Sequence, residues 1–236
     1  NKSKIEWYGL SFNPNAMDLL KANRNKIDWT WLSRNPNAMD LLKANRNKIN
    51  WEKLSMNPNA MDLLKANQSK INWTWLSCNP SDEAVDLLEA DENKDKIDWH
   101  FLSMNPNAMD LLKANQSKIN WKWLSANPNA MDLLEADENK YKIDWNWLSK
   151  NPNAMDLLKA NRGKIDWNRL SFNTNAMDLL EADENKYKID WHFLSANPNP
   201  NAMDLLKANR GKIDWNRLSE NPSIFTYNYE LIKEKN

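Results

Sequence analysis

The sequence predicts an all-α protein, an α-solenoid built from about ten helical-hairpin repeats of 22 to 26 residues each. Three observations predict this fold class. A tryptophan returns at a nearly fixed step along the 236 residues, apolar residues follow it at helical spacing, and a unit of this size cannot bury its own apolar face. Neighbouring units must therefore pack on one another. The periodic tryptophans are Trp7, Trp29, Trp51, Trp73, Trp99, Trp121, Trp145, Trp167, Trp191 and Trp215.

The first helix of a unit is predicted from about Trp29 to Arg34 in the copy that spans residues 27–48. Asp28 is a good N-cap because its carboxylate accepts hydrogen bonds from the free amides of the first turn. Ile27 before the cap and Leu32 in the helix have the spacing of a hydrophobic staple. Other units keep the cap chemistry with Asn50, Asn72 and Asn120.

The second helix of the unit is predicted to start at Asn35, which caps it, with Pro36 at the first helical position, where a missing amide hydrogen costs nothing. An apolar stripe at helical spacing follows, made of Ala38, Leu41 and Leu42. Asn45 is expected to end this helix in a left-handed conformation. Helices this short do not persist alone in water, so their stability must come from packing between units.

Longer units gain residues in two places, and both lie in predicted loops. One insertion follows the second helix, as in residues 137–142, and the other precedes it, as in residues 197–201. A loop accommodates two extra residues at small cost, whereas an insertion inside a helix would rotate its apolar stripe. We therefore expect a tandem array over residues 1–221 and a C-terminal capping segment over residues 222–236, in which Phe225, Tyr227 and Tyr229 cover the last apolar face.

Composition excludes several classes of function. Lys plus Arg and Asp plus Glu both number 32, so the net charge is zero, which disfavours generic binding to nucleic acid or to an anionic membrane. Cys78 is the single cysteine, which fits a reducing intracellular setting without a disulfide framework. No apolar run approaches the length of a bilayer span, and no signal peptide is visible. The start at Asn1, just ahead of a tryptophan, is typical of a fragment or a processed product.

The repeat itself speaks against an enzyme. A catalytic site needs a unique constellation of residues, while most polar residues here recur in nearly every copy. The rare reactive residues are Cys78, His100 and His192. Cys78 and His100 lie in neighbouring units, but other units replace Cys78 with many residue types, so we interpret it as a variable surface position. Neither the two histidines nor the acidic tracts at 89–92, 135–138 and 181–184 have metal-ligand spacing, and no cofactor is expected.

Two aromatic positions in each unit are interpreted differently. The periodic tryptophans are expected to form the core between units, in preference to a ligand site. Two residues after each of them the side chain varies between aromatic and cationic, which a core position would not accept readily. These variable side chains either form a row of partly exposed aromatic and cationic groups, named the ribbon, that contacts a partner, or they lay their apolar stems over the surface. The partner-binding candidates are Trp31, Trp75, Phe101, Trp123, Trp147, Arg169, Phe193 and Arg217.

The pattern Ile-x-Trp-x-x-Leu-Ser-x-Asn-Pro-x-Ala-x-x-Leu-Leu resembles the short Asn-Pro/Trp tandem repeats of proteins from large double-stranded DNA viruses of protists and algae. The resemblance covers nearly the whole chain, and residues 221–229 are similar to the way such arrays finish. It implies a helical repeat protein of viral origin that engages other proteins or serves as a structural component. It supplies no catalytic residue.

We therefore expect a non-enzymatic scaffold for protein–protein interaction, with the ribbon and the variable positions beside it as the contact surface. A structural component of a virus particle or assembly is the first alternative, with lateral or end-to-end self-association. Single-stranded nucleic-acid binding by aromatic stacking is the second. The expected location is the host cytoplasm or the virus particle, with no membrane partner.

Overall fold

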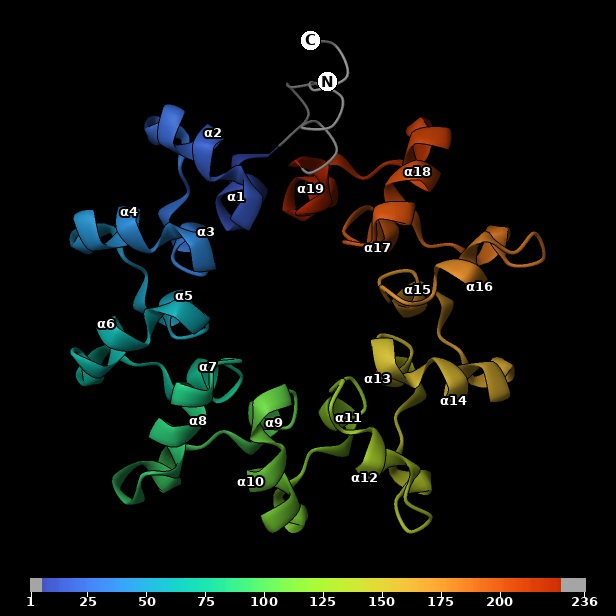
Figure 1. The fold of residues 1–236 in the computed structure, drawn as a ribbon, viewed down its shortest axis with the longest axis horizontal. Helices are drawn as coiled ribbons and strands as arrows, with labels where there is room; N and C mark the ends of the chain where they lie inside the picture. The colour runs from blue at the N-terminus through green and yellow to red at the C-terminus, as the bar shows by residue number, and fades with distance from the viewer. Residues whose placement is uncertain (1–5, 226–236) are drawn as a thin grey trace. The chain divides into compact units, whose positions relative to one another are not determined.

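The computed structural model describes residues 6–225, and every structural statement below concerns these residues. They form short helices joined by turns and extended linkers, without a strand in the described part (Figure 1). The all-α class is thereby confirmed, while the solenoid arrangement stays a prediction. No helix in this range combines the length and the apolar character that a membrane crossing requires. The chain divides into two compact units, unit 1 with residues up to 48 and from 167 onward, and unit 2 with residues 49–166.

In each unit, first helices that begin at a periodic tryptophan alternate with second helices. In unit 1 the first helices are α1 (Trp7–Phe12), α3 (Trp29–Leu32), α15 (Trp167–Leu170), α17 (Trp191–Ser195) and α19 (Trp215–Glu220). Its second helices are α2 (Met17–Ala22), α4 (Met39–Ala44), α16 (Met177–Glu181) and α18 (Pro200–Ala208).

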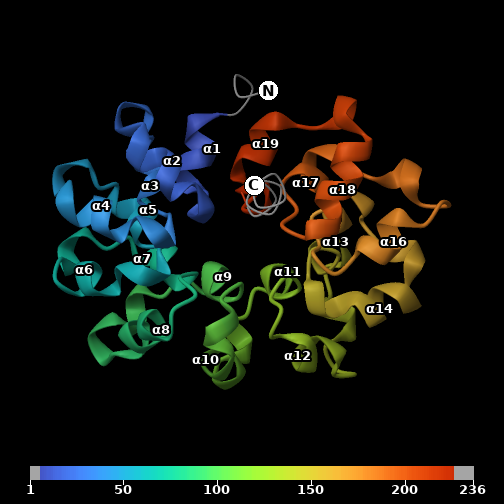
Figure 2. The same ribbon diagram turned by 45° about the horizontal axis from the view of Figure 1, so that its top comes forward.

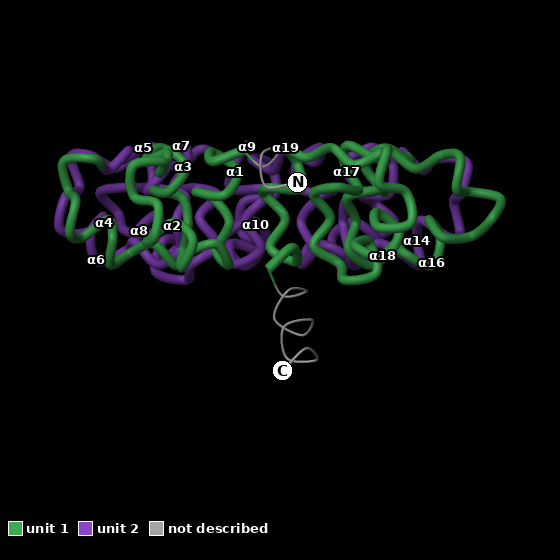
Figure 3. Tube along the Cα trace, turned by 90° about the horizontal axis from the view of Figure 1, so that it is seen from above, with its two compact units in different colours: residues 1–48, 167–236 green, residues 49–166 purple. Residues whose placement is uncertain are grey.

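Unit 2 has the same alternation. Its first helices are α5 (Trp51–Leu54), α7 (Trp73–Ser77), α9 (Trp99–Leu102), α11 (Trp121–Leu124) and α13 (Trp145–Leu148). Its second helices are α6 (Met61–Lys65), α8 (Asp82–Glu89), α10 (Met109–Ala114), α12 (Met131–Glu135) and α14 (Met155–Ala160). Taken one unit at a time, the labelled first helices lie along one edge and the labelled second helices along the other (Figure 3).

Short 3₁₀ helices, of three residues except for the six of Asp91–Lys96, precede or follow most second helices, which the sequence did not suggest. They are Pro14–Ala16, Arg24–Lys26, Pro36–Ala38, Arg46–Lys48, Pro58–Ala60, Gln68–Lys70, Asp91–Lys96, Pro106–Ala108, Gln116–Lys118, Lys140–Lys142, Pro152–Ala154, Arg162–Lys164, Lys186–Lys188 and Arg210–Lys212. Such turns are common at α-helix ends and as connectors, because they satisfy end groups with tighter hydrogen bonds.

The predicted N-caps are confirmed. Asp28 Oδ1 accepts hydrogen bonds from the backbone N–H groups of Thr30 at 3.0 Å and Trp31 at 3.2 Å, and Asn72 caps α7 through the N–H of Trp75 at 3.1 Å. Asn35 caps the second helix, starting with its 3₁₀ turn, by accepting from the N–H of Asn37 at 2.9 Å. The first helix is shorter than predicted, since α3 ends at Leu32.

The expected left-handed end at Asn45 is wrong. Asn45 has φ −133° and ψ 51°, and no non-glycine residue in the described range has a positive φ. The Asn45 side-chain amide instead donates to the carbonyl of Leu41 at 2.8 Å, which satisfies an end carbonyl of α4. The backbone therefore needs no left-handed residue to satisfy that carbonyl, and it continues into the next 3₁₀ turn.

The fully buried layer of each unit consists of small and aliphatic side chains. Leu32, Ala38 and Leu42 each have 0% of their surface exposed, and the same holds for Leu54, Ala60 and Leu64. The two staple residues, Ile27 and Leu32, are both buried. Burial of a leucine stabilises the fold by about 1.5 to 3 kcal/mol. The leucine of each Leu-Ser pair and the second leucine of each Leu-Leu pair therefore supply the core.

A row of buried asparagines, which we name the asparagine ladder, joins consecutive repeats. Each side chain Nδ2 donates to two backbone carbonyls of the adjacent repeat, which is the preceding one except for Asn13, at 2.7 to 3.2 Å, while its Oδ1 accepts from a backbone N–H two residues ahead. The members with these bonds are Asn13, Asn35, Asn79, Asn105, Asn127, Asn151, Asn197 and Asn221. The amide thus uses nearly all its bonding capacity without water.

Within unit 1, the first repeat of the chain packs against the last. Helices α1 and α19 lie side by side in two views (Figures 1 and 2). Asn13 donates to the carbonyls of Ser219 at 3.2 Å and Asn221 at 2.9 Å. The predicted capping segment lies mostly outside the described residues, Tyr227 and Tyr229 included, and Phe225 is half-buried. The face of α19 is therefore covered at least in part by α1.

Candidate interaction surface

The variable position two residues after each periodic tryptophan is the third residue of a first helix. In the capped first helices, such as α3 and α7, an Asp or Asn side chain accepts from the backbone N–H of this residue and so fixes its place in the first turn. All eight predicted partner-binding residues are half-buried. They are therefore neither core residues nor freely solvated, which fits a surface that a partner completes.

In unit 2 four of these residues form one continuous row of rings, which we name the aromatic ladder: Trp75, Phe101, Trp123 and Trp147. The ring centroids of Trp75 and Phe101 are 4.9 Å apart, and those of Phe101 and Trp123 are 6.2 Å apart. Trp123 and Trp147 are 4.3 Å apart. Neighbouring rings therefore support one another and hold their partly exposed surfaces in fixed positions.

Charged groups lie at one end of the aromatic ladder. The Lys53 ammonium lies over the Trp75 ring, 4.9 Å from its centroid, and the Trp75 indole N–H donates to Glu52 Oε1 at 3.0 Å. Lys53 also pairs with Glu52 at 3.1 Å. This hydrogen bond from Lys53 lowers the pKa of the Glu52 carboxyl. The ladder thus presents apolar rings beside a fixed cation and anion, residue types suited to an interface.

In unit 1 the position two residues after the periodic tryptophan holds both aromatic and arginine side chains. Trp31 contacts Tyr8 and Phe12, each with a centroid distance of 6.3 Å, and the Arg34 guanidinium lies 4.8 Å from the Phe12 centroid. Arg169 lies on α15, Phe193 on α17 and Arg217 on α19.

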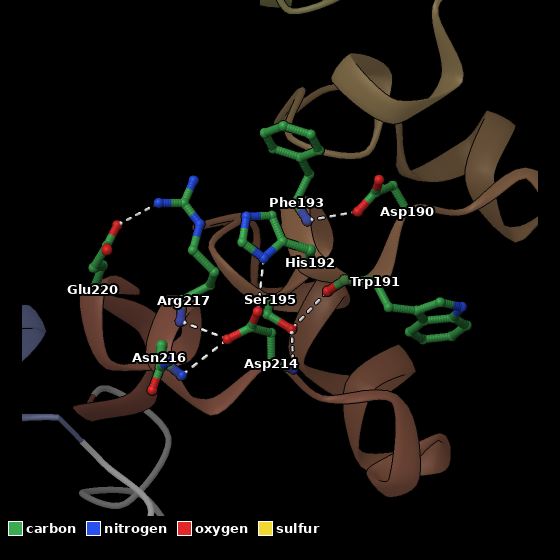
Figure 4. A network of polar contacts seen from close by, with 9 residues as sticks. All are labelled: Asp190, Trp191, His192, Phe193, Ser195, Asp214, Asn216, Arg217 and Glu220. Carbon is green, nitrogen blue, oxygen red and sulfur yellow. Dashed lines mark hydrogen bonds and ion pairs between the residues drawn. The ribbon is translucent and has the colours of Figure 1, made fainter.

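A network of polar contacts joins α17 to α19 in unit 1 (Figure 4). Nδ1 of His192 lies 2.7 Å from Oδ2 of Asp214, and Oδ1 of Asp214 caps α19 by accepting from the N–H groups of Asn216 and Arg217. Burial raises the pKa of the Asp214 carboxyl, but the hydrogen bonds with His192 and the backbone outweigh this effect, so the pKa is lowered overall. Arg217 pairs with Glu220 at 3.0 Å.

The expectation that the periodic tryptophans form the buried core is wrong, because all ten are half-buried. In nine repeats a lysine at the end of the same repeat lies over the indole, with its ammonium 4.2 to 4.8 Å from the ring centroid. The lysine covers the ring without removing it from water completely. Sequence reasoning missed this pairing because the two residues are 19 to 23 positions apart.

The sequence analysis also missed two exposed tyrosines. Tyr141 and Tyr187 have 82% and 81% of their surface exposed, and both lie in inserted residues after a second helix. The insertions themselves were the available signal, since inserted loop residues usually extend into solvent.

The rare reactive residues Cys78 and His100 lie on different helices of unit 2, Cys78 at the end of α7 and His100 in α9. The Cys78 thiol contacts the carbonyl of Trp75 at 3.3 Å, whereas His100 is exposed on α9. Among residues 6–225 no cluster of three or more His, Cys, Asp or Glu side chains could hold a metal ion. The residues that line an open hollow of about 450 Å³ include Trp99 and charges of both signs, Glu89 and Asp95 with Lys94 and Lys118.

Comparisons of this chain with protein-family models, with curated proteins and with solved structures found no match. The functional argument therefore rests on the geometry of the repeats.

Proposed function

We propose that the chain is a non-enzymatic α-solenoid scaffold for protein–protein interaction, and that the aromatic ladder of unit 2 is its principal contact surface. One observation carries the proposal: four rings in contact with one another are held, partly exposed, on consecutive first helices. Aromatic side chains held in place in this way lose little conformational entropy on binding and dominate many protein interfaces. The other predicted partner-binding residues, in unit 1, extend the surface.

The proposal also includes the source of the protein, which we infer from the sequence pattern. Its likeness to the Asn-Pro/Trp repeats of large DNA viruses supports a viral protein that acts in the host cytoplasm or in the particle. A structural role in a particle or assembly is the alternative within that setting, since identical repeats can pack laterally.

Single-stranded nucleic-acid binding is a weaker candidate. Two of the three ring pairs of the ladder have centroids only 4.9 and 4.3 Å apart, so these rings cover part of the faces on which bases would stack. The net charge of zero also removes the electrostatic attraction that such binding uses.

The test is a pair of matched double variants. Trp75→Ala with Trp123→Ala removes two rings of the aromatic ladder, and Tyr141→Ala with Tyr187→Ala removes two exposed rings outside it. Quantitative affinity purification from the source cells should show proteins that bind the wild type and the tyrosine variant and are lost from the ladder variant. Far-UV circular dichroism checks that all three chains keep their helices.

Three outcomes contradict the proposal. If the ladder variant keeps every partner, the ladder is not the contact surface. If it loses its helices, the rings belong to the core. If the material lost is nucleic acid with a steep dependence on salt, stacking on bases is the function instead.

A further inference from the structure

The contact between the first and last repeats in unit 1 reproduces four hydrogen bonds of the contact between the first two repeats. Between the first two repeats, Asn35 donates to the carbonyls of Ser11 and Asn13, both at 3.0 Å. The backbone N–H of Asp28 donates to Ser11 Oγ at 2.9 Å, and Asn37 donates to the carbonyl of Pro14 at 2.9 Å.

The terminal contact has the same four bonds. Asn13 donates to the carbonyls of Ser219 and Asn221, the backbone N–H of Glu6 donates to Ser219 Oγ at 3.0 Å, and Asn15 donates to the carbonyl of Pro222 at 3.0 Å. The last repeat thus receives the first repeat as if it were the next copy along the chain.

Gly9 adapts the first repeat to this contact. Nine other repeats carry Lys, Arg, Phe or Trp at the corresponding position. A Cβ added at Gly9 would lie 2.8 Å from the Cβ of Ser219 and 3.3 Å from the backbone nitrogen of Glu220, which is too close for any side chain without a shift. The two helices therefore approach more closely than a larger residue at Gly9 would allow, and the first repeat is matched to the last at this point.

We propose that this contact is also an interaction surface between two copies of the chain. The face of α1 with Gly9 and Asn13 is the head face, and the face of α19 with Ser219 and Asn221 is the tail face. Non-covalent bonds alone hold these two faces together, whereas the backbone links other consecutive repeats directly. The head face of one copy therefore has the groups needed to dock on the tail face of a second copy.

Within one molecule the two faces meet at an effective concentration of about millimolar or more, so the contact inside one chain outcompetes the contact between chains in dilute solution. The wild type should be a monomer at micromolar concentration. Assembly between copies appears only when the internal contact is blocked and one intact face remains on each partner.

Two variants satisfy that condition together. Gly9→Trp blocks the head face and leaves the tail face intact, and Ser219→Leu blocks the tail face and leaves the head face intact. Neither variant can close its own contact. Each variant alone should be a monomer by size-exclusion chromatography with light scattering. An equimolar mixture of the two at tens of micromolar should contain a dimer with twice the monomer mass.

Controls separate docking from misfolding. Gly163→Trp places the same large residue where an added Cβ meets nothing within 4 Å, so it should stay monomeric alone and in either mixture. Circular dichroism must show wild-type helicity for every variant, and Ser219→Val replaces Ser219→Leu if the leucine unfolds the last repeat. A mixture of folded variants that stays monomeric overturns the proposal.

Cross-linking fixes the geometry of the assembly. In a Cys78→Ala background, Pro222→Cys is added to the Gly9→Trp chain and Asn15→Cys to the Ser219→Leu chain, because Asn15 and Pro222 are in contact in the terminal joint. A short bismaleimide should then produce a covalent dimer. The control exchanges the two cysteines, so that Asn15→Cys is on the Gly9→Trp chain and Pro222→Cys is on the Ser219→Leu chain. Each cysteine then lies on a blocked face, and a cross-linked dimer from this pair contradicts the head-to-tail arrangement. None of these changes touches the aromatic ladder, so the result is independent of the partner experiment.

Discussion

Units 1 and 2 share the bonds that join their repeats and differ in the side chain two residues after each periodic tryptophan. Unit 2 has Lys53 followed by the four rings of the aromatic ladder, whereas unit 1 has Gly9, Trp31, Arg169, Phe193 and Arg217. The asparagine ladder is the same in both units, with side-chain amides donating to pairs of carbonyls. The difference teaches that the bonds between repeats depend on the constant residues, whereas the variable position is free to differ between the units.

The largest expected effect tests the shared part of this comparison. Asn79→Ala in unit 2 and Asn197→Ala in unit 1 each remove three hydrogen bonds to the backbone from a side chain that is 0% exposed. Each should lower the free energy of unfolding by about 3 kcal/mol, because the buried serine carbonyl and one backbone N–H lose their bond to the amide, while the asparagine carbonyl keeps a backbone N–H from Ala60 or Ala176. Urea unfolding followed by circular dichroism measures the loss.

Asn115→Ala is the matched control for that pair. The Asn115 side chain is half-buried and donates to the carbonyl of Leu111 at 2.9 Å, so its loss should be about 1 kcal/mol. Similar losses for Asn79 and Asn115, or a large difference between the two units, would contradict a common asparagine ladder.

The second prediction tests the variable position. Trp123→Ala should lower the free energy of unfolding by about 2 kcal/mol, because its ring contacts both Phe101 and Trp147. Arg217→Ala should cost less than about 1 kcal/mol, because its partner Glu220 is partly exposed and its buried Nε has no hydrogen-bond partner. Thermal unfolding compares the two variants, and equal losses would remove the distinction between the units.

The third prediction concerns the lysines over the periodic tryptophans. Lys118→Met in unit 2 and Lys48→Met in unit 1 keep an apolar stem and remove a charge that lies 4.6 Å from the centroid of Trp99 or Trp29. Each should lower the free energy of unfolding by about 0.5 to 1 kcal/mol, equally in the two units. Lys159→Met, on an exposed lysine of α14, provides the baseline, and a loss there of the same size argues against the ring contact.

The smallest expected effect is a pH dependence in unit 1. The folded chain lowers the pKa of Asp214, so its contribution to stability is present above the ordinary value of 3.8 and is lost as the pH falls through the lower folded value. Asp214→Asn keeps a cap of the kind found at Asn72. The stability difference between wild type and variant should shrink below pH 3.8, by less than about 1 kcal/mol because solvent screens the pair. Unfolding curves from pH 2 to pH 6 test this, and a difference that does not change with pH contradicts it.

Local elements were predictable from the sequence because their causes lie within a few residues. Asp28, Asn35 and Asn72 cap the helices that the pattern predicts, since the acceptor and its N–H donors are two or three positions apart. The end of α4 at Asn45 was predicted in the right place with the wrong geometry, because a side-chain bond to Leu41 competed with a left-handed turn. The alternation of helices followed from apolar spacing alone.

The candidate surface was predicted only as a row of residue types. Composition singled out Trp75, Phe101, Trp123 and Trp147, but their contact depends on the spacing of neighbouring helices, which no local pattern contains. The same reason explains the missed asparagine ladder. Asn in every copy was visible, and its cap to the next residues was predicted, but its donors bind carbonyls 22 to 28 positions earlier.

By itself the sequence determined the repeated unit: where each helix begins, which side chains are apolar, and that every copy needs a neighbour. The tertiary structure decided which neighbour, placing the first repeat against the last through Asn13, and how deeply each tryptophan is buried. The physical reason is distance along the chain. Caps and helical stripes act over one or two turns, whereas pairing between repeats depends on backbone groups that only the folded chain brings together.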